Sequence, residues 1–316
     1  MMQIVQAPRA LAILYSLLAQ RADSRPWLLP ANICPIVPVT FFKARVPFEL
    51  VDISTETLHM DVEQARGRLK RKRYGGILYA HTYGEPSTPH DFFGEVKSRY
   101  PDLLLVDDRC LCLPDLKPAS SAEVDVMLYS TGYAKIVDLG LGGYAFVSEG
   151  LDYQPAHLPF APHDHDQIEK AYKQTVQNHI WFVYHDSNWL ETDRDIPVWY
   201  DYCQQIEIGL KASLGHRGAL NDVYAKILPA DIQLPGAYQT WRFNIRVKDK
   251  QRVLDAIFKA GLFASSHYAS LAGIMAEGHA PQAHMLANHV INLFNDRHFT
   301  VKQAERVCAV IRENLK

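Results

Sequence analysis

Apolar positions in the first half of the chain follow two patterns, a helical spacing and short continuous runs. Leu11, Leu14, Leu17 and Leu18 recur at helical spacing, which predicts a first helix over residues 7–20. Each of the apolar runs that follow is bounded by turn residues and predicts a strand. These strands are expected at Trp27–Pro30, Phe48–Asp52, Gly76–Ala80, Leu103–Asp107, Val126–Ser130 and Gly143–Val147.

Helical spacing returns between the predicted strands, over residues 61–72 and 90–100. Strands that alternate with helices indicate βαβ units, and hence a mostly parallel sheet with helices on both faces. The sequence therefore predicts an α/β fold.

After residue 150 the alternation stops, and we expect a large α/β domain over residues 1–185 and a small α+β domain over 186–316. The His-, Pro- and Asp-rich stretch 157–166 suggests a linker. Further helices are expected at 167–189, 198–212, 220–228, 250–260 and 301–315, and strands at 241–247 and 263–268.

Reactive side chains follow the ends of two predicted strands. Asp108 closes one strand, Ser130 ends the next, and Lys135 stands shortly before the glycines at 140, 142 and 143. In a parallel α/β sheet, ligands bind outside the carboxyl ends of the strands. A lysine that forms a Schiff base and a carboxylate that keeps a ring nitrogen protonated are what pyridoxal phosphate requires. The pattern predicts a pyridoxal phosphate site.

Composition narrows the class of protein. With a formal net charge of −2 over 316 residues, the chain has no electrostatic footprint for nucleic acid. The basic run 66–73 sits at an expected helix end, where cations are favoured, so a solvated helix end is preferred to a polyanion site. No apolar stretch reaches the roughly 20 residues that cross a bilayer, and no signal peptide is recognisable. We expect a cytoplasmic protein without a membrane or nucleic-acid partner.

Metal binding is not predicted. The five cysteines are odd in number and irregularly spaced, which argues against a disulfide framework. Cys110 and Cys112 form a CxC pair without a second pair of ligands at a matching spacing, and core packing explains them better. His163 and His165, two residues apart in a polar stretch, seldom converge on one ion.

The order of several short motifs resembles the DegT family of aminotransferases. Individually the motifs are weak, but they occur in the family's order over about three quarters of the chain, and residues 150–194 match poorly. The motifs of the first half are Leu28–Cys34, Val46–Asp52, His81–Gly84, Val106–Asp108, Ser130 five residues before Lys135, and Gly142–Gly143. Those of the second half are Trp241–Asn244, Gly261–Phe263, Ala287–Leu293 and Thr300–Ala304.

The resemblance implies the type I fold of pyridoxal-phosphate-dependent transferases and a homodimer with sites at the interface. It also implies transfer of an amino group from an amino acid such as glutamate to a nucleotide-linked keto sugar, in polysaccharide or natural-product biosynthesis. The sugar, the nucleotide and the donor are not determined.

By the same resemblance, Lys135 forms the Schiff base and then moves protons between cofactor and substrate. Asp108 pairs with the ring nitrogen. Its neighbour Asp107 is the competitor, since strand alternation lets only one of the two face the site. Ser130 binds the cofactor phosphate together with backbone N–H groups at the start of the first helix, a natural anion site. Arg9 can add charge there.

Cys34 and His81 complete the implied cofactor contacts, and Cys34 stands where the family often places a stacking aromatic ring. Leu111 replaces a polar contact to the cofactor, and Leu141 replaces a glutamate. Three interpretations therefore stay open: a divergent aminotransferase, a protein that keeps the fold as a binding or non-catalytic partner, and another pyridoxal reaction such as dehydration. Lys135 favours the first, because dehydrating relatives carry histidine at its position.

Overall fold

The computed structural model describes residues 2–21, 24–117 and 123–315 and contains two β-sheets. The larger has seven strands in the order β1-β7-β6-β5-β4-β2-β3. Strands β6, β5, β4, β2 and β3 pair in parallel, and β7 is antiparallel to both of its neighbours, β6 and β1. The strands are β1 (Met2–Ala7), β2 (Trp27–Pro30), β3 (Phe48–Val51), β4 (Gly76–Ala80), β5 (Leu104–Asp108), β6 (Val126–Ser130) and β7 (Gly143–Ser148). The predicted mostly parallel α/β sheet is confirmed.

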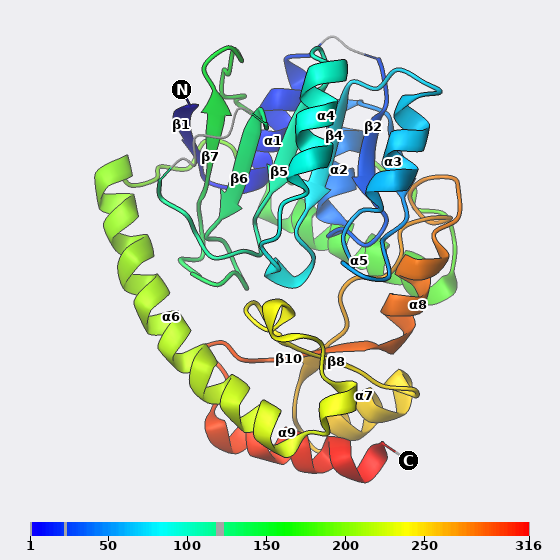
Figure 1. Ribbon diagram of the computed structural model, residues 1–316. Helices are drawn as coiled ribbons and strands as arrows, with labels where there is room; N and C mark the ends of the chain where they lie inside the picture. The colour runs from blue at the N-terminus through cyan, green and yellow to red at the C-terminus, as the bar shows by residue number, and fades with distance from the viewer. Residues whose placement is uncertain (1, 22–23, 118–122, 316) are drawn as a thin grey trace.

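Helices cover both faces of this sheet (Figure 1). One buried apolar cluster joins α1, α2 and α5 to one face, and a second joins α3, α4 and the first turns of α6 to the other. Burial of apolar side chains on both faces is what makes the strands read as continuous apolar runs. The helices are α1 (Ala10–Ala19), α2 (Ile36–Ala44), α3 (Val62–Leu69), α4 (His90–Arg99), α5 (Pro162–Asn178) and α6 (Trp199–Ile227), with a short 3-10 turn η1 (Thr82–Gly84).

The smaller sheet is antiparallel, in the order β8-β10-β9. It forms a third apolar cluster with the second half of α6 and with α7 and α9. Helix α6 therefore runs along the side of the molecule and belongs to both units (Figure 1). The elements are η2 (Ala230–Ile232), η3 (Gly236–Tyr238), β8 (Phe243–Arg246), α7 (Lys250–Lys259), β9 (Ala264–Ser265), α8 (Pro281–His289), β10 (Val290–Leu293) and α9 (Val301–Asn314). The domain boundary at 185/186 stays a prediction.

Four elements were not predicted. β1 is an edge strand that pairs with β7 through its backbone, so apolar and polar side chains alternate little along it. α2 contains Pro38 and several β-branched residues, but the proline lies in the first turn, where its missing N–H costs no helical bond. The short elements α8 and β10 follow one another without a break at 289–290, which hides both patterns.

Three predictions after residue 150 were wrong. Helix α5 begins at Pro162, inside the expected linker, because proline is well suited to the first helical position. It ends at Asn178, because His179 adopts a left-handed conformation with φ 51°. The expected end was near residue 189. The helices expected at 198–212 and 220–228 are one continuous helix, α6, despite glycines at 215 and 218.

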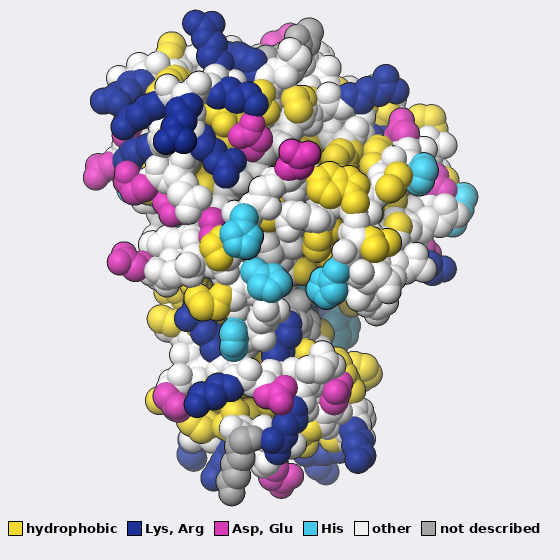
Figure 2. Space-filling view, turned by 90° about the vertical axis from the view of Figure 1, so that its right-hand side faces the viewer, with side chains coloured by type: hydrophobic (Ala, Val, Ile, Leu, Met, Phe, Trp, Pro, Cys, Tyr) yellow, Lys and Arg dark blue, Asp and Glu magenta, His cyan; other side chains and the backbone are white. Residues whose placement is uncertain are grey.

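Lys and Arg side chains gather at one end of the face shown in Figure 2, with acidic side chains beside them. In the basic run at the end of α3, Arg66 pairs with Glu95 at 2.7 Å and Lys72 pairs with Glu49 at 2.6 Å. Partly exposed pairs of this kind are typical of a solvated helix end. Among the described residues, none of the helices is both long and apolar enough to span a membrane.

Candidate active site

A cavity of about 690 Å³ opens at the carboxyl ends of the parallel strands, where α1 begins, and α5 covers it. Such a location is expected for a ligand site in an α/β sheet. All of the site residues predicted from the sequence line this cavity: Arg9, Cys34, His81, Asp108, Ser130 and Lys135. Leu111 lines the cavity too, but the space remains open.

Lys135 lies in the loop between β6 and β7 and is half-buried. Thr131 fixes both ends of this loop: its N–H donates to the carbonyl of Gly142 at 3.1 Å, and its carbonyl accepts from Leu139 N at 2.9 Å. Gly142 has φ +96°, and a Cβ there would lie 2.2 Å from the Tyr202 hydroxyl. A Cβ on Gly143 would lie 2.2 Å from the backbone nitrogen of Ala10. The glycine run thus lets the lysine loop close against α1 and α6.

The two aspartates at the end of β5 point in different directions. Asp108 lines the cavity and accepts from Cys110 N at 3.0 Å. Asp107 lies outside the cavity wall, 2.7 Å from His81 Nε2 and 2.6 Å from Arg109 Nε. Burial opposes ionisation of Asp107, but the contacts with His81 and Arg109 outweigh it and lower the pKa. Strand alternation therefore places Asp108, rather than Asp107, beside Lys135.

Two thiols and a tyrosine line the cavity together with the lysine and the aspartate. Desolvation raises the pKa of Cys34, with Lys135 acting in the opposite direction and Asp108 in the same one. Burial and Asp108 raise the pKa of Cys110. Burial and the neighbouring Cys34 also raise the pKa of Tyr268, which lines the cavity. Lys135 and Asp108 both act on the pKa of Cys34 and of Cys110, so the two charged groups lie within electrostatic range of the same pair of thiols.

Arg9 and Ser130 meet at the end of the cavity nearest α1. A Cβ on Gly132 would lie 3.5 Å from Ser130 Oγ and 3.9 Å from Arg9 Nη1, so the two polar groups flank the bare backbone of this glycine. Arg9 donates from Nε to Glu191 at 3.1 Å and from Nη1 to the carbonyl of Gly140 at 3.2 Å. A hydroxyl, a guanidinium and a helix start together form a potential anion site.

His81 lines the cavity, yet both of its ring nitrogens are occupied. Nδ1 lies 2.7 Å from the carbonyl of Glu85, and Nε2 lies 2.7 Å from Asp107. The ring can therefore offer only its carbon atoms to a ligand. Its neighbour Tyr83 is buried, with its hydroxyl donating to the carbonyl of His267 at 2.6 Å.

Sequence reasoning did not assign several cavity residues. Glu191 lies in the stretch that resembles the family least, and Tyr268 lies at the end of the predicted strand 263–268, outside the motifs of the resemblance. The i, i+4 pair Ile168 and Tyr172 on α5 was a detectable signal, since these residues form an apolar stripe on an otherwise polar helix.

The described residues contain one group of potential metal ligands, His165, Asp166 and Glu169 on α5. Their ligand atoms lie within 4.8 Å of one another, and all three side chains are exposed. It is a different set from the pair His163 and His165 considered in the sequence. Exposed acidic groups are common without an ion, so we assign no metal site.

Comparison with known structures identifies the fold. A DegT DnrJ EryC1 StrS aminotransferase from Brucella abortus superposes with a TM-score of 0.69 at 14% identity, covering 99% of this chain and 86% of the other. A putative sugar aminotransferase from Streptococcus pneumoniae, in its PMP form, gives a TM-score of 0.71 at 15% identity and covers 98% and 87%. DesI, solved in the presence of its TDP-sugar product, gives 0.72 at 15% identity and covers 98% and 80%. No family model matches the chain, and neither does any curated protein sequence. The shared fold is that of the type I pyridoxal-phosphate-dependent transferases.

Proposed function

We propose that this chain is a pyridoxal-phosphate-dependent aminotransferase and a divergent member of the DegT family. The observation that carries the proposal is that Lys135 and Asp108 line one cavity, together with Cys34 and Cys110, whose pKa values respond to both of them. Solved structures of aminotransferases share the fold of this chain. The order of motifs along the chain supports the same conclusion.

The residues present fit pyridoxal phosphate. The cavity volume of about 690 Å³ is within the range of small-molecule sites. Asp108 offers a carboxylate for a protonated ring nitrogen, Lys135 offers an amine for an aldehyde, and Ser130 and Arg9 flank Gly132 where a phosphate can approach the backbone. When bound, the cofactor supplies an electron sink for the substrate carbon that loses or gains a proton.

Each side chain then has a distinct task. The Lys135 amine accepts the proton from the donor's carbon and returns a proton to the acceptor's carbon. The Asp108 carboxylate would stabilise positive charge on the ring nitrogen. Ser130 donates its hydroxyl and Arg9 its guanidinium to phosphate oxygens. Cys34 and Tyr268 pack beside the ring and exclude water.

The proposed substrates are a nucleotide-linked keto sugar and an amino-acid donor. Among the described residues, Arg9 and Lys135 are the only Lys or Arg side chains that line the cavity, and Arg9 is paired with Glu191. The phosphates of a nucleotide and the carboxylate of a donor therefore need cations from elsewhere. A homodimer with sites at the interface could supply them. It would also cover exposed apolar side chains that follow α5 and begin α6, namely Ile180, Trp181, Val183, Val198 and Tyr200.

The visible spectrum of the purified protein tests the proposal. With added pyridoxal phosphate, we expect an absorbance band of the lysine-bound cofactor that Lys135→Ala abolishes and Lys226→Ala, an exposed lysine on α6, leaves unchanged. Amino transfer is then measured with glutamate and a panel of nucleotide-linked keto sugars. A colourless wild-type protein that takes up no cofactor would support the alternative, a binding or non-catalytic partner.

A further inference from the structure

Three successive backbone carbonyls of the lysine loop are held by side chains from outside the large sheet. Trp241 Nε1 donates to the carbonyl of Ala134 at 2.7 Å, and Arg217 Nη2 donates to that of Lys135 at 3.1 Å. Ser213 Oγ donates to the carbonyl of Ile136 at 2.5 Å. Ser213 and Arg217 lie on α6, and Trp241 lies two residues before β8, the first strand of the small sheet. The peptide that carries the reactive amine is therefore held from the α6 and small-sheet side.

Arg217 is the centre of this arrangement. It is only 4% exposed, and its guanidinium also donates to Ser213 Oγ at 2.9 Å, to the carbonyl of Trp241 at 2.6 Å and to Asn295 Oδ1. Within the described part of the chain, its hydrogen-bond acceptors are all neutral oxygens. Burial and the nearby Arg242 lower its pKa to about 10, against the opposing charges of Asp296 and Asp138. A buried cation without a carboxylate contact is costly, which suggests that its fixed fork of donors serves to join these segments.

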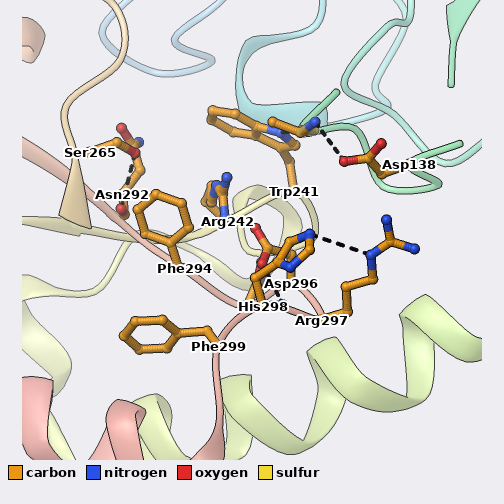
Figure 3. A network of polar contacts seen from close by, with 12 residues as sticks. Asp138, Trp241, Arg242, Ser265, Asn292, Phe294, Asp296, Arg297, His298 and Phe299 are labelled. Carbon is orange, nitrogen blue, oxygen red and sulfur yellow. Dashed lines mark hydrogen bonds and ion pairs between the residues drawn. The ribbon is translucent and has the colours of Figure 1, made fainter. Parts of the chain in front are cut away.

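Trp241 links the same loop to the cavity wall. Its indole stacks on Tyr83 with ring planes 3° apart and on Tyr268 with planes 14° apart, both at 6.4 Å between ring centres. Tyr268 lines the cavity beside Cys34. Figure 3 shows Trp241 and Arg242 together beside the loop that carries Asp138. One tryptophan thus contacts both the lysine loop and an aromatic wall of the site.

The loop is also fixed from within. The carboxylate of Asp138 accepts from the backbone nitrogens of Ala134, at 3.0 Å, and Gly140, at 2.9 Å. Ala134 has φ 59°, a left-handed conformation that is uncommon for alanine. The carbonyls of residues 134–136 accept their hydrogen bonds from Trp241, Arg217 and Ser213 instead. Loss of one of these donors leaves a partly buried carbonyl without a partner.

We propose that Trp241 and Arg217 are positioning residues for Lys135, through which α6 and the small sheet set where the amine stands in the cavity. Neither residue touches the cavity itself among the contacts of the described chain. The role assigned to the amine rests on the proposed function, whereas the positioning follows from the hydrogen bonds alone. It can therefore be tested with and without the cofactor.

The test is Trp241→Phe, which keeps a stacking ring and removes the Nε1 donor. The matched control is Trp199→Phe, at the start of α6, where the indole packs on Tyr144 but no hydrogen bond of its Nε1 is observed among the described residues. Lys135 is labelled by formaldehyde with a borane reductant, without pyridoxal phosphate, and the rate is read by peptide mass spectrometry across a pH series. We expect Trp241→Phe to label about five to ten times faster at Lys135, the factor expected for one lost hydrogen bond. The exposed Lys226 should label at the wild-type rate in every variant.

Ser213→Ala provides a second, milder variant that removes one donor without changing an aromatic ring. It should accelerate labelling of Lys135 in the same direction, by about two- to fivefold. Rates at Lys135 within twofold of wild type in both variants would overturn the proposal, and so would an equal acceleration in Trp199→Phe. With pyridoxal phosphate, Trp241→Phe should bind the cofactor about tenfold more weakly. If the wild-type protein binds no cofactor, the proposed function fails, and the labelling rates still decide the positioning.

Discussion

The cavity has two walls that are built in different ways. The strand-end wall, formed by Asp108, Ser130 and the Lys135 loop, rests on parallel strands and on backbone hydrogen bonds at both ends of the loop. The cover, formed by α5 and residues 180–193, contains no strand and joins the rest of the molecule through side chains and through a backbone hydrogen bond from Phe182 N to the carbonyl of Ile274 at 2.8 Å. Its side-chain contacts include the pairs Arg9–Glu191 and Lys43–Asp186 and the stacking of Phe42 on Phe182 and Tyr184.

The difference between the two walls separates residues that a reaction needs in a fixed position from residues that can vary. Groups that react must be held in a fixed geometry, and a sheet edge with a doubly tethered loop provides one. Side-chain contacts of a covering segment can change without disturbing the sheet, so the cover is suited to set which substrate enters. The resemblance to the DegT family follows the same division. The motifs at the strand ends match the family, and residues 150–194 match it poorly.

The largest expected effect comes from the strand-end wall. Asp108→Asn keeps the shape of the side chain but removes the charge that stabilises a protonated ring nitrogen, so we expect turnover to fall about 10²–10³-fold. Steady-state amino transfer by the pure variant measures this. Asp107→Asn is the comparison on the other side of β5, and it should instead lower stability, because it weakens the buried contacts with His81 and Arg109. Equal losses of turnover in the two variants would contradict the assignment of Asp108.

Strand ends were predictable from sequence because several physical constraints agree there. A buried parallel strand needs a continuous apolar run, and alternation along β5 lets only one of Asp107 and Asp108 face the site, of which the resemblance selects Asp108. The glycines at the start of β7 predict that the backbone packs closely against a neighbouring element. In the structure these neighbours are Ala10 and Tyr202. Each of these signals is local in sequence.

The cover was not predictable, because its position depends on partners distant in sequence. Glu191 lines the cavity and pairs there with Arg9, 182 residues earlier. The helix α5 was misplaced at both ends, since proline and a polar first turn suggested a linker. The same holds for the donors to the lysine loop: Arg217 and Trp241 are 82 and 107 residues from the carbonyls that they bind.

Acid should weaken the strand-end wall through a buried histidine beneath it. Burial and the nearby His81 lower the pKa of His59 to about 3, from an ordinary value of 6.5. The unfolded chain therefore binds a proton at His59 that the folded protein excludes, so stability is lost as pH falls below 6.5. The expected slope is about 1.4 kcal/mol per pH unit for this group. His267, whose pKa is lowered to about 4, adds in the same direction.

Urea unfolding at pH 7, 6 and 5 measures this dependence. His59→Phe should reduce the slope by about half, since His267 remains. A slope equal to that of wild type would show that His59 does not remain neutral in the folded protein. Below about pH 4 the ion-paired carboxylates also titrate, so the comparison is restricted to the range above it.

The smallest effect is expected where the cover meets the anion end of the cavity. Glu191→Gln removes a negative charge 3.0 Å from the Arg9 guanidinium but keeps an oxygen that can accept its hydrogen bond. The freed positive charge should tighten binding of a phosphate, by only about two- to fivefold, because the Arg9 side chain is 37% exposed and solvent screens it. The measurement is the ratio of dissociation constants for pyridoxal and pyridoxal phosphate, which isolates the phosphate. Arg9→Gln should lower this ratio. If Glu191→Gln lowers it as well, the carboxylate serves to orient Arg9 more than to neutralise it, and the cover then contributes to cofactor binding as well as to substrate choice.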